Sequence, residues 1–133
     1  MTRIRLAKAQ RLLKLNREMQ KLEEEKLTSA RWQQAELREE QGNLIETLSG
    51  AAEMQTLPTP MVLKRLRKLD DQQRALETEI TARSASLRTV ATRAKFSERL
   101  TKEYEVQHKR AVEEKALLEA IERILMKGDA SLP

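Results

Sequence analysis

The stretch from Thr56 to Pro60 limits what this chain can fold into, because it holds two of the chain's three prolines. A proline inside a helix removes a backbone donor and clashes with the preceding turn, so no helix can run through this stretch. Thr59 is a suitable N-cap, and Pro60 then falls at the first helical position, where its missing N–H costs nothing. The stretch therefore predicts one helix before it, a reversal of the chain, and one helix after it.

The segments on either side have the composition of long helices. Of the 133 residues, 35% are charged and only 2% are aromatic. This balance is typical of thin helices with most of their surface in water. We expect an all-α fold, in which two long helices form one antiparallel coiled-coil hairpin over residues 1–133. The first helix is predicted at about 4–50, the turn at about 51–59, and the second helix at about 60–127.

Apolar residues of the first helix recur at coiled-coil spacing in two stripes. The first stripe is Leu12, Leu15, Met19 and Leu22, and the second is Ala30, Gln34, Leu37, Gln41, Leu44 and Leu48. Joining the stripes through Lys26 takes consecutive steps of four residues, which predicts a stutter that locally relaxes the supercoil, with Leu27 taking over the packing. Gly50 is predicted to end the helix.

The second helix has two apolar registers that do not connect smoothly. The first is Val62, Leu66, Leu69, Gln73, Leu76, Ile80, Arg83, Leu87, Val90 and Ala94. The second is Leu100, Tyr104, Gln107, Ala111, Glu114, Leu118, Ile121 and Leu125. We expect a disturbed supercoil between Arg93 and Leu100, with Phe96 filling the irregular space. Gly128 is predicted to end this helix.

Pairing the two helices predicts their relative register. Partner numbers should sum to about 110, and a shift by one heptad is the main alternative. Each seam glutamine then faces a leucine, as Gln41 faces Leu69, and no two polar residues stack. The N-terminus would lie near residues 105–109, and the second helix would project beyond it.

The sequence offers little for catalysis. It has no cysteine, and its single histidine, His108, lies on a polar stretch where we expect it to be solvated, so a metal site is not expected. Neighbouring acids such as Asp70 and Asp71 point in different directions around a helix, and the isolated glycines form no phosphate loop. We therefore expect no catalytic residue, no metal, no cofactor, no small-molecule substrate and no enzymatic activity.

Basic residues gather in two segments that the hairpin would bring side by side. Residues 1–17 contain no acidic residue, and residues 83–102 contain only Glu98. We interpret these segments as a binding surface for an acidic partner, with a solvated helix face as the alternative. Nucleic acid is not the expected partner, since no known module or aromatic stacking platform is present. The candidate residues are Arg3, Arg5, Lys8, Arg11, Arg93, Arg99 and Lys102.

Two apolar features complete the candidate sites. Leu118, Ile121 and Leu125 lie where the second helix would have no partner helix, so another protein is expected to cover them. Trp32 lies about opposite the seam, because two residues turn a helix by ~200°. It is predicted either to be a contact site or to lie flat over neighbouring aliphatic stems.

The chain resembles the FliJ/YscO family of flagellar and type III secretion export. The resemblance is carried by the basic, leucine-rich opening Arg3-Ile4-Arg5-Leu6 and Leu12-Leu13-Lys14-Leu15, by the break at Pro58 to Pro60, and by the longer second helix. It implies a coiled-coil stalk or adaptor that docks into a hexameric export ATPase, contacts the export gate in the membrane and handles export chaperones.

We expect a cytoplasmic location, because no apolar run approaches the ~20 residues that span a bilayer. A place at the inner membrane would come only through the partners that the resemblance implies. Two other functions remain open from the sequence. One is a basic coiled coil that binds nucleic acid, and the other is a structural coiled coil that assembles with itself.

Overall fold

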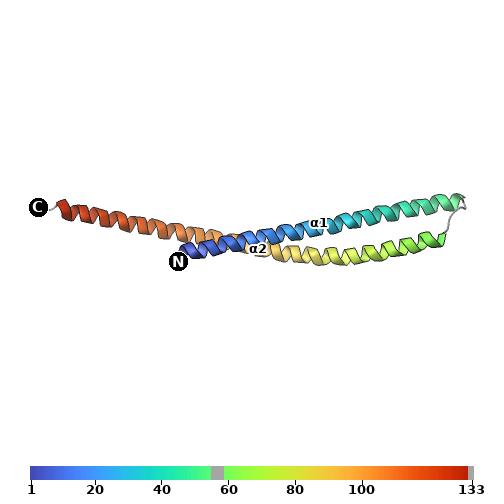
Figure 1. The fold of residues 1–133 in the computed structure, drawn as a ribbon, viewed down its shortest axis with the longest axis horizontal. Coiled ribbons are helices and arrows are strands. Elements are labelled where there is room, and N and C mark those ends of the chain that lie inside the picture. Colours follow the sequence, from blue (N-terminus) through green and yellow to red (C-terminus); the bar gives the residue numbers. More distant parts are fainter. Residues whose placement is uncertain (55–58, 132–133) are drawn as a thin grey trace. The chain divides into compact units, whose positions relative to one another are not determined.

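The structure is a computed structural model that describes residues 1–54 and 59–131, with side chains described for 1–50 and 60–128. These residues form two long helices and no strand: α1, Thr2–Met54, and α2, Thr59–Ser131 (Figure 1). Residues 55–58 of the predicted turn, and the predicted cap by the Thr59 side chain, lie outside this description.

Both helices are longer than predicted. α1 continues past Gly50 to Met54, and α2 continues past Gly128 to Ser131. The predictions that these glycines end their helices are therefore wrong. A glycine costs a helix only about 1 kcal/mol relative to alanine, which does not by itself stop a long helix.

The helices pack against each other within two compact units. Unit 1 consists of residues 1–18 and 91–133, and unit 2 consists of residues 19–90. In each unit a segment of α1 lies beside a segment of α2 that runs in the opposite direction (Figure 1). This arrangement confirms the predicted all-α helical hairpin.

From Leu27 on, the seam of unit 2 follows the predicted heptads. Its buried apolar residues are Leu27, Ala30, Leu69, Leu76 and Val90, and Leu69 is completely buried. All five occupy positions a or d of a heptad abcdefg, the positions that face the partner helix. The apolar pattern of α1 after Leu27, and that of α2 from Val62 to Ala94, was therefore read correctly from the sequence.

Two neighbouring layers of this seam each hold a glutamine. Gln73 donates a hydrogen bond of 2.7 Å from Nε2 to Gln41 Oε1 across the two helices. The prediction that no two polar residues stack is therefore wrong for this pair. The pair is tolerated because each half-buried amide satisfies part of the other's hydrogen-bonding capacity.

Residues at position g of the two helices face each other in unit 2. Arg65 donates from Nε to Glu40 Oε1 at 2.8 Å, and its guanidinium also forms an ion pair with the same oxygen. Each of these residues directly precedes an a-position residue of its helix, Leu66 and Gln41. The contact is a charge pair between the two helices, and it shows that the g flanks of the two helices lie on the same side.

The seam of unit 1 is made of small and polar residues. Its buried members are Ala9, Asn16, Ala94, Ser97 and Thr101. They continue the alternating steps of three and four residues. On α1 the steps lead from Ala9 through Leu13, Asn16, Gln20 and Glu23 to Leu27, and on α2 they lead from Val90 through Ala94 and Ser97 to Thr101.

Two predictions fail for this reason. The heptads of α1 pass Lys26 without a stutter, and those of α2 are not disturbed between Arg93 and Leu100. The sequence reading followed the largest apolar residues. The helices instead pack through smaller side chains, which allow a close approach and satisfy their polar atoms within the seam.

Candidate partner-binding surfaces

Polar contacts set how the two helices of unit 1 meet. Asn16 donates from Nδ2 to Ser97 Oγ at 2.6 Å in the buried seam, and Thr101 donates from Oγ1 to the Ser97 carbonyl at 2.7 Å. Near the N-terminus, Thr2 Oγ1 lies 3.1 Å from His108 Nδ1. The prediction that the N-terminus lies near residues 105–109 is confirmed. His108 is half-buried against Thr2 and is not the fully solvated side chain that the sequence predicted.

The second part of α2 in unit 1 has no α1 residue beside it. From residue 112 to 128 every side chain is exposed except the half-buried Ala120, and Figure 1 shows this end of α2, in red, without a neighbouring helix. The predicted apolar residues Leu118, Ile121 and Leu125 are all exposed here. Leu117 and Ile124 are also exposed and widen the stripe. Their spacing from Ile121, four residues before it and three after it, could have revealed them in the sequence.

The predicted basic residues are exposed on unit 1. Arg3, Arg5, Lys8 and Arg11 lie on α1, and Arg93, Arg99 and Lys102 lie on α2. Lys102 forms an ion pair with Glu98 of its own helix, from Nζ to Oε1 at 3.2 Å. Among the described residues, the other six form no ion pair. The structure therefore leaves six of the seven candidate cations available to a partner.

The first predicted apolar stripe of α1 is not in the seam. Leu12, Leu15, Met19 and Leu22 are all exposed. Counted from the a and d residues, they occupy positions g and c, which form a second stripe on the flank of the helix. Phe96 occupies position c of α2 and is 66% exposed, so the prediction that it fills an irregular space is wrong. The unbroken heptads from Ala9 to Leu48 were the sequence signal for this second stripe.

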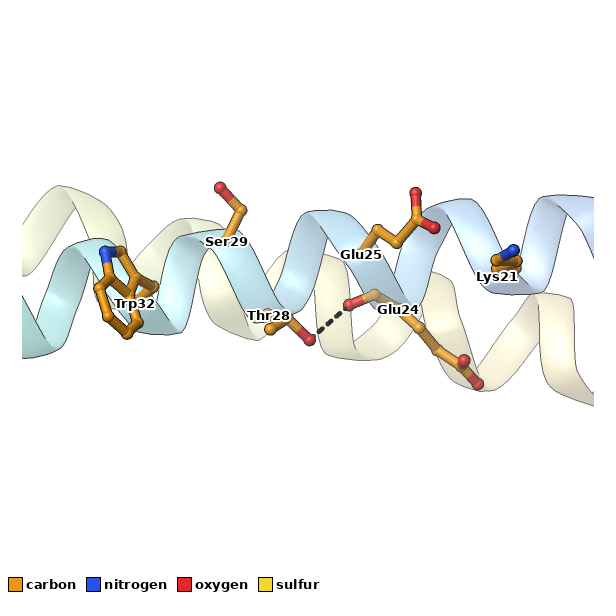
Figure 2. Close-up of a pocket in the computed structure, with 6 residues that line it drawn as sticks. All are labelled: Lys21, Glu24, Glu25, Thr28, Ser29 and Trp32. Atoms are coloured by element: carbon orange, nitrogen blue, oxygen red, sulfur yellow. Dashed lines mark hydrogen bonds between the residues drawn. The ribbon is translucent and has the colours of Figure 1, made fainter.

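Trp32 projects from the outer surface of α1 in unit 2. It is 68% exposed, and its Nε1 donates to Glu36 Oε1 at 2.9 Å. Figure 2 shows it at one end of a shallow hollow, where Thr28 donates to the Glu24 carbonyl at 2.9 Å. All the residues that line this hollow belong to α1: Lys21, Glu24, Glu25, Thr28, Ser29 and Trp32. The hollow is thus a groove along one helix. It is not a pocket between two helices that could enclose a ligand.

Comparisons with known proteins identify no relative. No protein-family model matches the chain, and neither a curated protein nor a solved structure matches it. Over the residues described, neither α1 nor α2 has a stretch both long and apolar enough to cross a lipid bilayer. The fold and the exposed surfaces define a helical hairpin with two apolar stripes outside its seam, one on the flank of α1 and one at the end of α2.

Proposed function

We propose that the protein is a non-enzymatic stalk or adaptor of a flagellar or type III protein-export apparatus, which docks into the ring of the export ATPase. The observation that carries this proposal is the solitary end of α2. Its exposed apolar stripe includes Leu118, Ile121 and Leu125, and no α1 residue covers it. Because most helical stability comes from packing such a stripe, this part of the helix needs a partner protein.

The charge of unit 1 supports the same function. Six of its candidate cations form no ion pair among the described residues: four lie on α1, and Arg93 and Arg99 lie on α2 before its solitary end. A mainly basic surface of this kind steers association with an acidic partner and raises its rate. In the proposed role the hairpin also links the ATPase to the export gate in the membrane and to export chaperones, and it works in the cytoplasm.

The docking proposal is tested by binding of the purified chain to an export ATPase from the same cell, measured by biolayer interferometry. Leu118→Asp combined with Ile121→Asp should abolish binding, because charges would replace the centre of the apolar stripe. Val106→Asp is the matched control, since Val106 is exposed on the same helix before the solitary end. Equal binding by the parent and the double variant would show that α2 does not dock in this way.

Self-assembly is the second candidate function, because the same exposed stripes could be covered by further copies of the chain. Sedimentation velocity over a range of concentrations separates the two. The protein is a structural coiled coil if it forms oligomers, if Leu118→Asp dissociates them, and if the chain does not bind the ATPase. Binding to duplex DNA that weakens steeply with salt would favour a nucleic-acid-binding protein instead.

A further inference from the structure

Unit 1 carries an apolar surface on one flank of its seam. On α1, Leu12 occupies position g and Leu15 occupies position c; on α2, Leu100 occupies g and Phe96 occupies c. In this antiparallel packing the g flanks of the two helices share one side, as the contact between Arg65 and Glu40 shows within unit 2. The four unit 1 residues Leu12, Leu15, Phe96 and Leu100 therefore share one side, which we call the g/c face.

The large apolar residues of this face lie outside the packed seam between the two helices. The seam beside them is filled by small residues such as Ala9, Ala94 and Ser97. Leu12 is 44% exposed, Leu15 is 53% exposed, and only Leu100 is half-buried. A helix whose a/d and g/c positions are both apolar has two sides that can pack, and only the a/d side is covered in unit 1.

Cations surround the apolar residues of the g/c face. Arg5 and Arg93 occupy position g, and Lys8 occupies position c, on the same two helices. None of the three forms an ion pair among the described residues. Along the g and c positions of the α2 segment in unit 1, from residue 91 on, the first acidic residue is Glu103, which follows Leu100. The face is thus apolar at its centre and positively charged around it.

We propose that the g/c face binds an acidic amphipathic helix of another protein as a third helix of unit 1. The apolar stripe of that helix would cover Leu12, Leu15 and Phe96, and its flanking carboxylates would pair with Arg5, Lys8 and Arg93. This site differs from the solitary end of α2, and it does not depend on the proposed docking to an export ATPase.

A second copy of the chain is a poor occupant for this face. A two-fold interface uses the same patch on both subunits, so the patch must be self-complementary. Two g/c faces placed together would bring Arg5, Lys8 and Arg93 of one copy close to the same cations of the other copy, and these like charges repel. An acidic helix offers both the apolar cover and the opposite charge.

The first test places a reporter on the face. The chain has no cysteine, so Phe96→Cys gives a single site for an environment-sensitive fluorophore, and Ile45→Cys gives a control site. Ile45 lies on α1 at position e, outside the g/c face, and is 50% exposed. The probe is a designed amphipathic helical peptide with a leucine stripe flanked by glutamates, and its control has lysines in place of the glutamates.

The acidic peptide should shift the emission of the label at position 96 to shorter wavelength and leave the label at position 45 unchanged. The lysine peptide should have no effect on either label. The proposal is overturned if the acidic peptide moves neither label, if it moves both equally, or if the lysine peptide acts equally well.

The second test removes the face by substitution and follows the acidic peptide by fluorescence anisotropy. Leu15→Glu should weaken binding at least tenfold, whereas Ile45→Glu should leave it unchanged. Arg5→Gln combined with Arg93→Gln should weaken binding severalfold at low salt and reduce its salt dependence. Leu118→Ser combined with Ile121→Ser should leave peptide binding intact. The peptide-binding proposal and the ATPase-docking proposal can therefore be refuted separately.

Two other outcomes would replace the proposal. A dimer of the chain alone that Leu15→Glu dissociates and Ile45→Glu does not would show that the face joins two copies. Duplex DNA is the other possible ligand. If DNA competes with the acidic peptide, and if Leu15→Glu does not weaken DNA binding, then the cations of this face bind nucleic acid. If Leu15→Glu proves unfolded by circular dichroism, the label at position 96 still decides between these outcomes.

Discussion

Asn16 and Ser97 are joined by a hydrogen bond of 2.6 Å inside the buried seam of unit 1. Both residues occupy d positions, and their neighbours in the seam include Ala9 and Ala94. A polar residue at a seam position lowers the stability of a coiled coil but specifies its register, because a shifted register leaves the polar group buried without a partner. This pair therefore defines which residues of α1 and α2 meet in unit 1.

Ser97→Ala should destabilise the hairpin. The substitution leaves the Asn16 amide buried without its acceptor, which is expected to lower the free energy of unfolding by about 1–3 kcal/mol. Urea denaturation followed by circular dichroism measures the change. Ser86→Ala, at an exposed serine of the same helix, is the control and should have little effect. Equal unfolding midpoints for the two variants would mean that the Asn16 contact does not stabilise the fold.

The register of unit 1 can be tested with a disulfide. Asn16→Cys and Ser97→Cys place two thiols at neighbouring small positions of the seam, so mild oxidation should join them within one chain. In the alternative register, shifted by one heptad, position 16 would meet position 104. Asn16→Cys with Tyr104→Cys is therefore the comparison, and should crosslink poorly. Preferential crosslinking of the second pair, detected by mass spectrometry at high dilution, would contradict the register described here.

Gly42→Ala should stabilise α1. Gly42 lies inside the helix, and a Cβ atom added there would have no atom within 4 Å other than its own helix backbone and neighbours. Alanine restricts the unfolded chain and favours the helix, so a gain of about 1 kcal/mol is expected. Gly50→Ala is the comparison and should gain less, because helix ends fray. Thermal unfolding measures both, and a lower melting temperature for Gly42→Ala would argue against a continuous α1.

The fold of unit 2 was predictable because its seam is built from large apolar residues. Leu69, Leu76 and Val90 lie whole heptads apart at d positions, and no other face of α2 competes with them there. The predicted register also agrees with the contact between Thr2 and His108, whose numbers sum to 110. The pairing of Gln41 with Gln73 was missed. Two glutamines in neighbouring layers can form hydrogen bonds to each other or to water, and hydrophobic periodicity does not distinguish these two arrangements.

Unit 1 was misread because its largest apolar residues are not in its seam. Hydrophobic periodicity assigns a leucine such as Leu12 or Leu15 to the core, whereas the packed positions hold Ala9 and Asn16. The distinction depends on the continuation of the heptads from unit 2, a longer pattern than any local stripe. The exposed end of α2 was predictable from helix lengths alone, but what covers it depends on a molecule outside the chain.

Charge reversal on unit 1 should weaken the proposed association with the export ATPase. The variant changes four exposed arginines to glutamate: Arg3, Arg11, Arg93 and Arg99. None of them forms an ion pair among the described residues, so the hairpin should keep its helical content. Binding to an acidic surface of the ATPase should fall by at least about tenfold at low ionic strength, because attraction becomes repulsion. The difference from the parent should shrink as salt is added.

A matched variant separates this local effect from net charge. It reverses four exposed cations of unit 2: Arg31, Arg38, Arg67 and Lys68. Both variants carry the same net charge, so a loss of binding confined to the unit 1 variant would assign the attraction to that surface. Equal losses would mean that only the overall charge of the chain matters. If the unit 1 variant binds the ATPase as well as the parent does at low salt, the basic residues of unit 1 take no part, and the contact must be sought around Trp32.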